Sequence, residues 1–316
     1  MILNIILLIV GFVILIKGAD VFVEGASGVA GNFKISKMLI GLTIVSFGTS
    51  APEFAISIKS LLSGSGDIVL GNVIGSNILN ILLILGCSSI VHSLTVKSNT
   101  VKKELPITML ITILFAVLLS DALFDKGMIN QFSRSDGIVL VLFFTVFLYY
   151  LIKMARNKTE EDADKYLISM KKAAIFTIIG IVGIVLGSNF VVDSASYIAK
   201  AIGVSERMIS LTIIALGTSL PELVTSVTAT MKGEYDIAIG NVVGSNIFNI
   251  GIVVGIPVAI FGGIGHIAFS YVDLIVMVVS AIIVFLFSFN DYKITRHEGI
   301  GLLLLFISYY GYVILG

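Results

Sequence analysis

The feature that most constrains this chain is an internal repeat. Residues 41 to 86 reappear at 210 to 255, shifted by 169 positions without a gap. The segment GLTIVSFGTSAPEF of the first copy becomes SLTIIALGTSLPEL in the second. A second pair of blocks keeps the same shift, since DIVLGNVIGSNILN at 67–80 becomes DIAIGNVVGSNIFN at 236–249. The chain therefore contains two copies of one structural unit.

The hydrophobicity of the chain predicts that both copies lie in a membrane. Hydrophobic residues make up 57% of the sequence and charged residues 13%, with a mean hydropathy of +1.08, far from the composition of soluble globular proteins. A helix needs roughly 20 apolar residues to cross a bilayer. We predict an all-α membrane protein with ten transmembrane helices, near 2–24, 36–61, 66–92, 104–121, 136–155, 172–192, 206–231, 236–263, 268–288 and 298–315.

An odd number of spans in each unit predicts that the two units are inverted relative to each other. With five spans per unit, the second copy enters the membrane from the opposite side, an arrangement typical of secondary transporters. Placing both termini outside puts 14 Lys and Arg residues in inner loops and 5 in outer loops, which satisfies the positive-inside rule. We predict a first repeat at 1–155, a cytoplasmic linker at 156–171, a second repeat at 172–316, and extracellular termini in the cell membrane.

Each unit sets a glutamate, Glu53 or Glu222, inside a long apolar span. A carboxylate at the bilayer centre costs about 2.5 to 3.5 kcal/mol on insertion scales. The segments that contain the glutamates, 41–54 and 210–223, include no basic residue. A cation from solution is therefore the natural counter-charge. The pattern Ser50-x-x-Glu53, which also repeats, fits a helix capping box as well, and the two roles can coexist.

The proline before each glutamate opposes a continuous helix, because it lacks an amide donor. Carbonyls near 46–49 and 215–218 are expected to lack intrahelical partners. Irregular backbone at this depth is tolerated only where it is buried in protein or faces a water-filled cavity. We therefore expect discontinuous core helices whose carbonyls, with the hydroxyls of Thr49 and Thr218, can bind hard cations.

The second blocks add a stripe of neutral oxygens on one helix face. At spacings of four residues, each copy presents an asparagine, a serine and a second asparagine. These residues are Asn72, Ser76 and Asn80 in the first copy, and Asn241, Ser245 and Asn249 in the second. Glycines four residues apart on the same helices also fit close helix packing with asparagine as an interhelical donor. The recurrence beside both glutamates favours ion binding, because transporter sites form where repeats meet.

All of these candidate ligands are oxygens, and none of the blocks contains histidine or cysteine. Such a set suits Ca²⁺, which takes about six to eight oxygen ligands at about 2.3 to 2.6 Å, and it also suits Na⁺. Mg²⁺ fits less well, because it demands tight octahedral geometry. Zinc and copper would favour histidine or cysteine, and no cofactor is expected.

The paired motifs resemble those of a known superfamily. GTSxPE followed by GNxxGSNxxN, once in each half, resembles the two alpha repeats of the cation/Ca²⁺ exchanger superfamily, most closely those of prokaryotic Na⁺/Ca²⁺ exchangers. The resemblance implies two inverted five-helix units around mid-membrane ion sites. It implies that Glu53 and Glu222 are shared carboxylates, and that Thr49 and Thr218 contribute to a central Ca²⁺ site.

The resemblance also implies flanking Na⁺ sites. One site would contain Ser46, Thr49, Ser76 and Glu53, the other the Ala215 carbonyl, Thr218, Ser245 and Glu222, and Asn80 and Asn249 would line the middle. Asn249 stands where K⁺-dependent members and some prokaryotic exchangers carry aspartate. The centre therefore carries two negative charges, which Ca²⁺ would cancel, and this departure argues against K⁺ co-transport.

The sequence thus predicts a transporter and not an enzyme: an antiporter exchanging Na⁺ for Ca²⁺ by alternating access, with spans one and six rocking against a fixed core. An H⁺/Ca²⁺ exchanger using the same glutamates is the alternative. An intramembrane hydrolase would need a base near Ser50 or Ser219, and the blocks contain no histidine or lysine. A channel would not need inverted symmetry. Expected partners are Ca²⁺, Na⁺ and the lipid bilayer, with no nucleic acid, no obligatory protein partner and a monomeric state.

Overall fold

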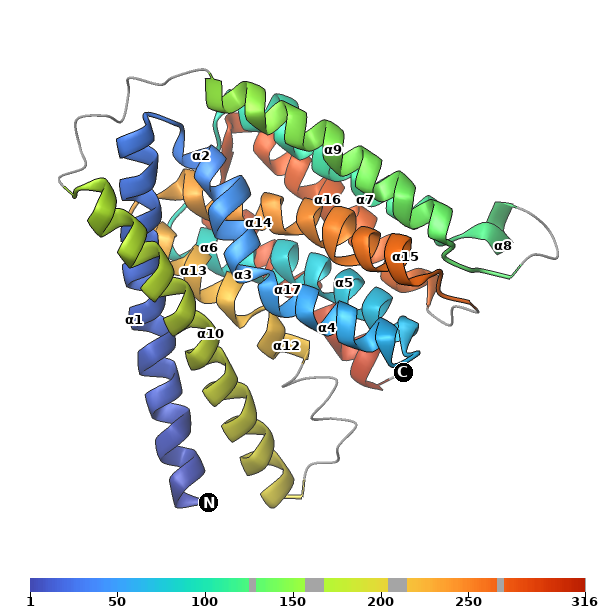
Figure 1. Ribbon diagram of the computed structural model, residues 1–316, viewed down its shortest axis with the longest axis horizontal. Helices are drawn as coiled ribbons and strands as arrows, with labels where there is room; N and C mark the ends of the chain where they lie inside the picture. The colour runs from blue at the N-terminus through green and yellow to red at the C-terminus, as the bar shows by residue number, and fades with distance from the viewer. Residues whose placement is uncertain (125–128, 157–167, 204–214, 266–269, 316) are drawn as a thin grey trace.

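The protein is built almost entirely of helices (Figure 1). The computed structural model describes residues 1–124, 129–156, 168–203, 215–265 and 270–315. Most of the predicted linker, residues 157–167, lies outside this part of the chain. Several core helices change locally to π-helical geometry, and these segments are labelled η.

The first half contains five helical spans and one short connecting helix. In chain order its helices are α1 (Ile2–Phe33), α2 (Lys37–Ile40), η1 (Gly41–Val45), α3 (Ser46–Thr49), α4 (Ala51–Leu62), α5 (Gly66–Leu79), η2 (Asn80–Leu85), α6 (Gly86–Val91), η3 (Thr100–Glu104), α7 (Leu105–Leu118), α8 (Asp121–Phe124) and α9 (Arg134–Arg156).

The described part of the second half follows the same order, without counterparts of η3 and α8. Its helices are α10 (Met170–Ala201), α12 (Ala215–Thr218), α13 (Leu220–Met231), α14 (Tyr235–Phe248), η5 (Asn249–Val254), α15 (Gly255–Phe261), α16 (Tyr271–Asp291) and α17 (Arg296–Leu315). Two short antiparallel strands, β1 (Leu94–Thr95) and β2 (Lys293–Ile294), join loops of the two halves.

The helices account for the predicted spans. Among the described residues, seven continuous helical segments are long and apolar enough to cross a bilayer, and an eighth span is the pair 37–49 and 51–62, bent by 47°. One of the two remaining predicted spans, 104–121, corresponds to η3 with α7. The other, 206–231, corresponds to α12 with α13 in its described part, and its residues 206–214 lie outside the described ranges. The predicted all-helical membrane fold with broken core helices is therefore confirmed.

Helices α1 and α10 pack side by side along one edge of the molecule (Figure 1). A Cβ on Gly18 would lie 2.7 Å from the amide nitrogen of Ile184, and one on Gly187 would lie 2.5 Å from that of Leu15. Residues nearer the end of α1 therefore contact residues nearer the start of α10. The two equivalent helices run antiparallel, which is the inverted relation that the odd span count predicts.

Both helices are longer than the sequence predicted. They end at Phe33 and Ala201, not near 24 and 192. In α1 the reason is packing, because its small residues from Gly25 to Ala30 continue the buried face beyond the most hydrophobic stretch.

The most buried helices are the second-block segments of the two repeats. The stretches from α5 to α6 and from α14 to α15 are largely enclosed, whereas the faces of α1, α9 and α17 are mostly exposed. The main cluster of buried apolar side chains surrounds these two stretches. Lipid-facing helices thus wrap a central pair that carries the repeated polar stripes.

Candidate ion-binding site

A helix break sits directly before each glutamate. Helix α3 ends at Ser50, where φ and ψ are −84° and 7°, and α4 begins with proline in its first turn. The second copy does the same at Ser219, with −90° and 3°. Glu53 and Glu222 therefore lie in the first turns of α4 and α13, where the positive end of a helix dipole stabilises a carboxylate.

The two glutamates meet in the interior of the protein. Each is 1% exposed. The hydroxyl of Ser50 donates to Oε1 of Glu222 at 2.8 Å, so the first repeat contacts the carboxylate of the second. No ion pair between either glutamate and a basic side chain is found within the described ranges. Two buried carboxylates are thus brought together without a basic partner there.

The capping-box alternative is wrong. Neither Ser50 nor Ser219 makes a side-chain cap on the helix that follows it. The Ser50 hydroxyl is used instead between the repeats, and the hydroxyl of Ser219 is buried without a partner in the described chain.

Two of the carbonyls expected to lack partners accept a hydrogen bond. The carbonyl of Ser46 accepts the N–H of Ser50 at 3.0 Å, because the helix continues one turn up to the break. The carbonyl of Gly217 accepts the hydroxyl of Ser188 on α10 at 3.0 Å. A carbonyl oxygen has a second lone pair, so these atoms can still face a cation, but they do not lack partners.

Four asparagines form a symmetric network at the crossing of α5 and α14. The Nδ2 of Asn80 donates to Oδ1 of Asn246 at 2.9 Å, and the Nδ2 of Asn249 donates to Oδ1 of Asn77 at 3.2 Å. Asn77 and Asn246 also bond to each other's backbone carbonyls, at 3.3 and 3.4 Å. The sequence interpretation gave these two residues no role, although both recur under the 169-residue shift.

This network fixes the orientation of the two predicted ligands. Because the Nδ2 groups of Asn80 and Asn249 are engaged, their Oδ1 atoms are left buried and without partners in the described structure. The Oε2 atoms of Glu53 and Glu222 and the Oγ of Ser245 are also buried and without described hydrogen-bond partners. Buried acceptors normally have hydrogen-bond partners, so a set of five open oxygens needs a cation or ordered water to satisfy it.

The other predicted site residues lie on α3, α5, α12 and α14. Helix α3 packs against α14, and α12 packs against α5, so each repeat places its broken helix on the polar stripe of the other. The residues are Ser46 (1% exposed) and Thr49 (1%) at the two ends of α3, Ser76 (3%) on α5, Ser245 (0%) on α14, and Ala215 and the half-buried Thr218 on α12. Donors from both repeats therefore converge on one region.

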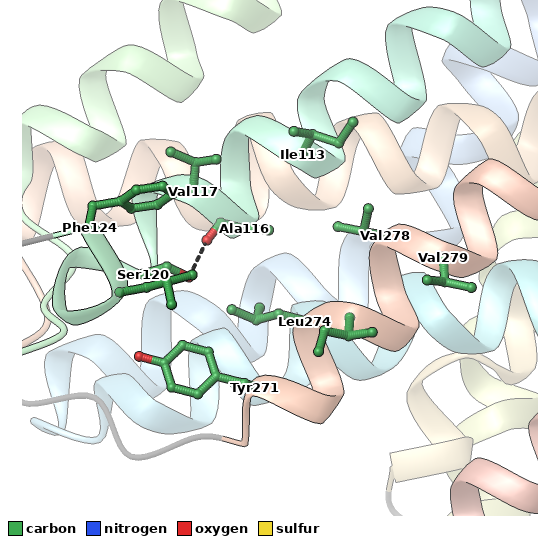
Figure 2. Close-up of a pocket in the computed structure, with 11 residues that line it drawn as sticks. Ile113, Ala116, Val117, Ser120, Phe124, Tyr271, Leu274, Val278 and Val279 are labelled. Carbon is green, nitrogen blue, oxygen red and sulfur yellow. Dashed lines mark hydrogen bonds between the residues drawn. The ribbon is translucent and has the colours of Figure 1, made fainter.

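A cavity of about 390 Å³ elsewhere does not belong to this site. Figure 2 shows it between α7, α8 and α16, lined by apolar side chains such as Ile113, Val117 and Leu274. The hydroxyl of Ser120 at its edge donates to the carbonyl of Ala116 at 2.7 Å. The cavity contains none of the repeated polar residues, and its lining suits lipid more than ions.

Known proteins share both the sequence and the fold of this chain. The sequence model described as sodium/calcium exchanger protein matches residues 3–153 and 172–315. CaxA from Alkalimonas amylolytica is 38% identical over 315 residues, covering 96% of each chain. The sodium/calcium exchanger MaX1 from Methanosarcina acetivorans is 30% identical over 340 residues, covering 97% of each chain.

A solved structure gives the same result. The sodium-calcium exchanger NCX_Mj, soaked with 10 mM Na⁺ and zero Ca²⁺, superposes with a TM-score of 0.85 at 34% identity, covering 97% of each chain. Because 97% of this chain is covered, the match includes both repeats. From this combined likeness in sequence and fold, the chain belongs to the sodium/calcium exchanger family of multi-pass membrane transporters.

Proposed function

We propose that this protein is an antiporter that exchanges Na⁺ for Ca²⁺ across the cell membrane, independently of K⁺. The observation that carries the proposal is the set of five open, buried oxygens from both repeats, two of which belong to Glu53 and Glu222. The names of the family and of MaX1 and NCX_Mj support the choice of ions. The exchange would use inward Na⁺ movement to expel Ca²⁺.

Charge and donor chemistry favour Ca²⁺ at the centre. Glu53 and Glu222, with Thr49 and Thr218, would hold the ion, and Asn80 and Asn249 would add neutral oxygens. One Ca²⁺ cancels the charge of two carboxylates, whereas Na⁺ must bind more than once to do the same. Oxygen ligands without nitrogen or sulfur match both ions.

Two flanking Na⁺ sites would share these carboxylates. Ser46 and Ser76 would complete the site beside Glu53, and the Ala215 carbonyl and Ser245 would complete the site beside Glu222. Because the sites use common oxygens, Na⁺ and Ca²⁺ would compete, which is what exchange requires. The ions can drive a conformational change only through unequal affinity for the two access states.

The close pair of α1 and α10 would be the moving element. Their interlocked glycines favour motion as one body, while the asparagine network ties the two core helices together. We further propose that the repeats, 1–155 and 172–316, flank a cytoplasmic linker at 156–171, with both termini outside.

An H⁺/Ca²⁺ exchanger is the second candidate. Each glutamate has an Oε2 atom without a partner in the described chain, and such an atom could hold a proton as readily as face a Na⁺ ion.

Ca²⁺ uptake into proteoliposomes distinguishes the two candidates. We expect an outward Na⁺ gradient to drive uptake with no pH gradient and no K⁺ present. Uptake driven by a pH gradient in the absence of Na⁺, with no response to Na⁺, would replace the proposal with proton exchange. An absolute requirement for K⁺ would refute K⁺ independence. Glu53→Gln liposomes serve as the transport-dead control.

A further inference from the structure

Two equivalent asparagines, Asn72 and Asn241, make different contacts. The Nδ2 of Asn241 donates to the hydroxyl of Ser226 at 2.9 Å and to the backbone carbonyl of Glu222 at 3.4 Å. The Nδ2 of Asn72 is buried and has no hydrogen-bond partner in the part of the chain that the structure describes. Buried polar groups are rarely left in this condition, so its isolation needs a physical reason.

The ion site cannot supply that reason. An amide nitrogen carries two N–H donors and does not coordinate a cation, so Asn72 needs an acceptor. The repeat identifies one, because Ser57 is the residue equivalent to Ser226. It lies on α4, which packs against α5, and its hydroxyl is 0% exposed and also without a described partner. An unused donor and an unused acceptor thus occupy the two places that are bonded in the other half.

The bonded asparagine lies on a closely packed helix. Helix α14, which carries Asn241, lies against α2 and η1, so that a Cβ on Gly240 would be 2.9 Å from the Cα of Gly41. The residue equivalent to Gly41 is Ser210, which lies outside the described residues, so the comparison between the halves rests on the asparagine and serine side chains.

We propose that the Asn241–Ser226 and Asn72–Ser57 bonds are alternating locks. The first holds the access state seen here, and the second forms in the opposite access state, where the first is broken. This inference rests on the proposed alternating-access exchange and adds the residues that balance it. Because each state leaves one asparagine amide without its partner, the two states stay close in energy. Ser57 and Asn72 are thus positioning residues for the conformational change.

Replacing Ser57 with alanine tests the proposal, because the Ser57 hydroxyl has no hydrogen-bond partner in the described chain. We expect Ser57→Ala to keep the thermal unfolding midpoint of wild type or raise it, and to leave the half-saturating Ca²⁺ concentration unchanged. Its exchange turnover should fall about fivefold, the effect of losing one ordinary hydrogen bond from the opposite state. Ser57→Thr, which restores a hydroxyl, should recover the rate.

A matched control is Ser288→Ala on α16. Ser288 is also 0% exposed, with a hydroxyl that has no described partner, but it lies outside the core pair. It should not change turnover. A Ser57→Ala rate within about a factor of two of wild type, or a Ser288→Ala rate reduced equally, would overturn the proposal.

A second measurement needs no transported ion. In ion-free protein, the Ser226→Ala and Asn241→Ala shifts in unfolding midpoint should be non-additive, because the residues are bonded, whereas those of Ser57→Ala and Asn72→Ala should add. Gly240→Ala disfavours the close packing seen here, so in that background the non-additivity should move to Ser57 and Asn72. Additive Ser57 and Asn72 shifts in both backgrounds would overturn the locks.

The two measurements separate the lock from the driving ion. In one outcome, wild-type protein shows no Na⁺-driven exchange while Gly240→Ala still transfers the non-additivity from Ser226 and Asn241 to Ser57 and Asn72. In that case the proposed function fails and the locks stand. If exchange is Na⁺-driven and the Ser57 variants behave like wild type, the locks fail and the function stands.

Discussion

The surroundings of Glu222 and Glu53 differ although their sequences match. Around Glu222, Ser50 donates to the carboxylate and Asn241 donates to the backbone carbonyl. Around Glu53, the equivalent hydroxyl of Ser219 and the equivalent Nδ2 of Asn72 have no partners in the described chain. The hydrogen bonds made around Glu222 are thus not repeated around Glu53 in the described chain. A symmetric pair of repeats has therefore taken an asymmetric conformation, which is what an inverted-repeat transporter needs to expose its site to one side at a time.

The centre between the halves is symmetric by contrast. The four-asparagine network makes the same bonds in both directions. The asymmetry thus concerns the contacts around the two glutamates and not the asparagine network. Substitutions can test whether equivalent residues have unequal effects around the glutamates and equal effects in the network.

The largest effect is expected from the glutamates themselves. Glu53→Gln or Glu222→Gln should each abolish Ca²⁺ stabilisation, because both carboxylates would hold the same ion. At a Ca²⁺ concentration of about 100 times Kd, wild type should gain about 2.7 kcal/mol of unfolding free energy, and each variant close to none. Ca²⁺-dependent thermal unfolding of purified protein measures this. Glu298→Gln, at the start of α17, is the control. If only one of the two variants lost the effect, a shared site would be excluded.

The glycines of the second blocks come next. Gly240→Ala should lower stability by about 1 to 3 kcal/mol, because its Cβ would lie 2.9 Å from both the Cα of Gly41 and the carbonyl oxygen of Met38. Gly71→Ala meets no described atom and should be neutral or stabilise its helix by about 0.5 to 1 kcal/mol. Unfolding midpoints without ions compare the two. Equal destabilisation by both would mean that the halves are packed alike.

The asparagine network should respond equally on both sides. Asn77→Ala and Asn246→Ala each leave a buried amide of the partner repeat without its acceptor, at a cost of about 1 to 2 kcal/mol. Because these acceptors orient Asn80 and Asn249, Ca²⁺ affinity should fall about tenfold in both variants. Calorimetric titration checks this. Effects that differ strongly between the two would show that the centre is not symmetric in solution.

The smallest effect concerns an ion pair between the halves that has no counterpart at the equivalent positions. Lys232 at the end of α13 bonds Asp20 of α1, at 2.7 Å to Oδ1 and 2.8 Å to the carbonyl, whereas the equivalent positions hold Ser63 and Asn189. Both side chains are partly exposed, so Lys232→Gln should cost only about 0.2 to 1 kcal/mol, and less at high salt. Salt-dependent thermal unfolding measures it, with Lys59→Gln as control. A larger, salt-independent loss would point to a role beyond a surface pair.

Several features of the fold and site followed from residue pattern alone. Apolar stretches of bilayer length located the spans, and the proline before each glutamate located the helix breaks, because a missing N–H interrupts a helix wherever it lies. The odd number of spans required inversion, which the antiparallel packing of α1 and α10 confirms. The roles of Asn77 and Asn246 did not follow, because they depend on which side chain of the opposite repeat each one faces.

The repeat also misled in one respect, since a capping box is a local pattern and the bond that Ser50 makes is not. Its hydroxyl reaches Glu222, a residue 172 positions away. The sequence by itself determined that two equivalent units, each with a buried acid, lie inverted in a membrane, because hydropathy, span number and proline act locally. Only the tertiary structure decided that the units differ, because equivalent side chains make different bonds: Asn241 donates to Ser226, whereas the Nδ2 of Asn72 has no partner in the described chain.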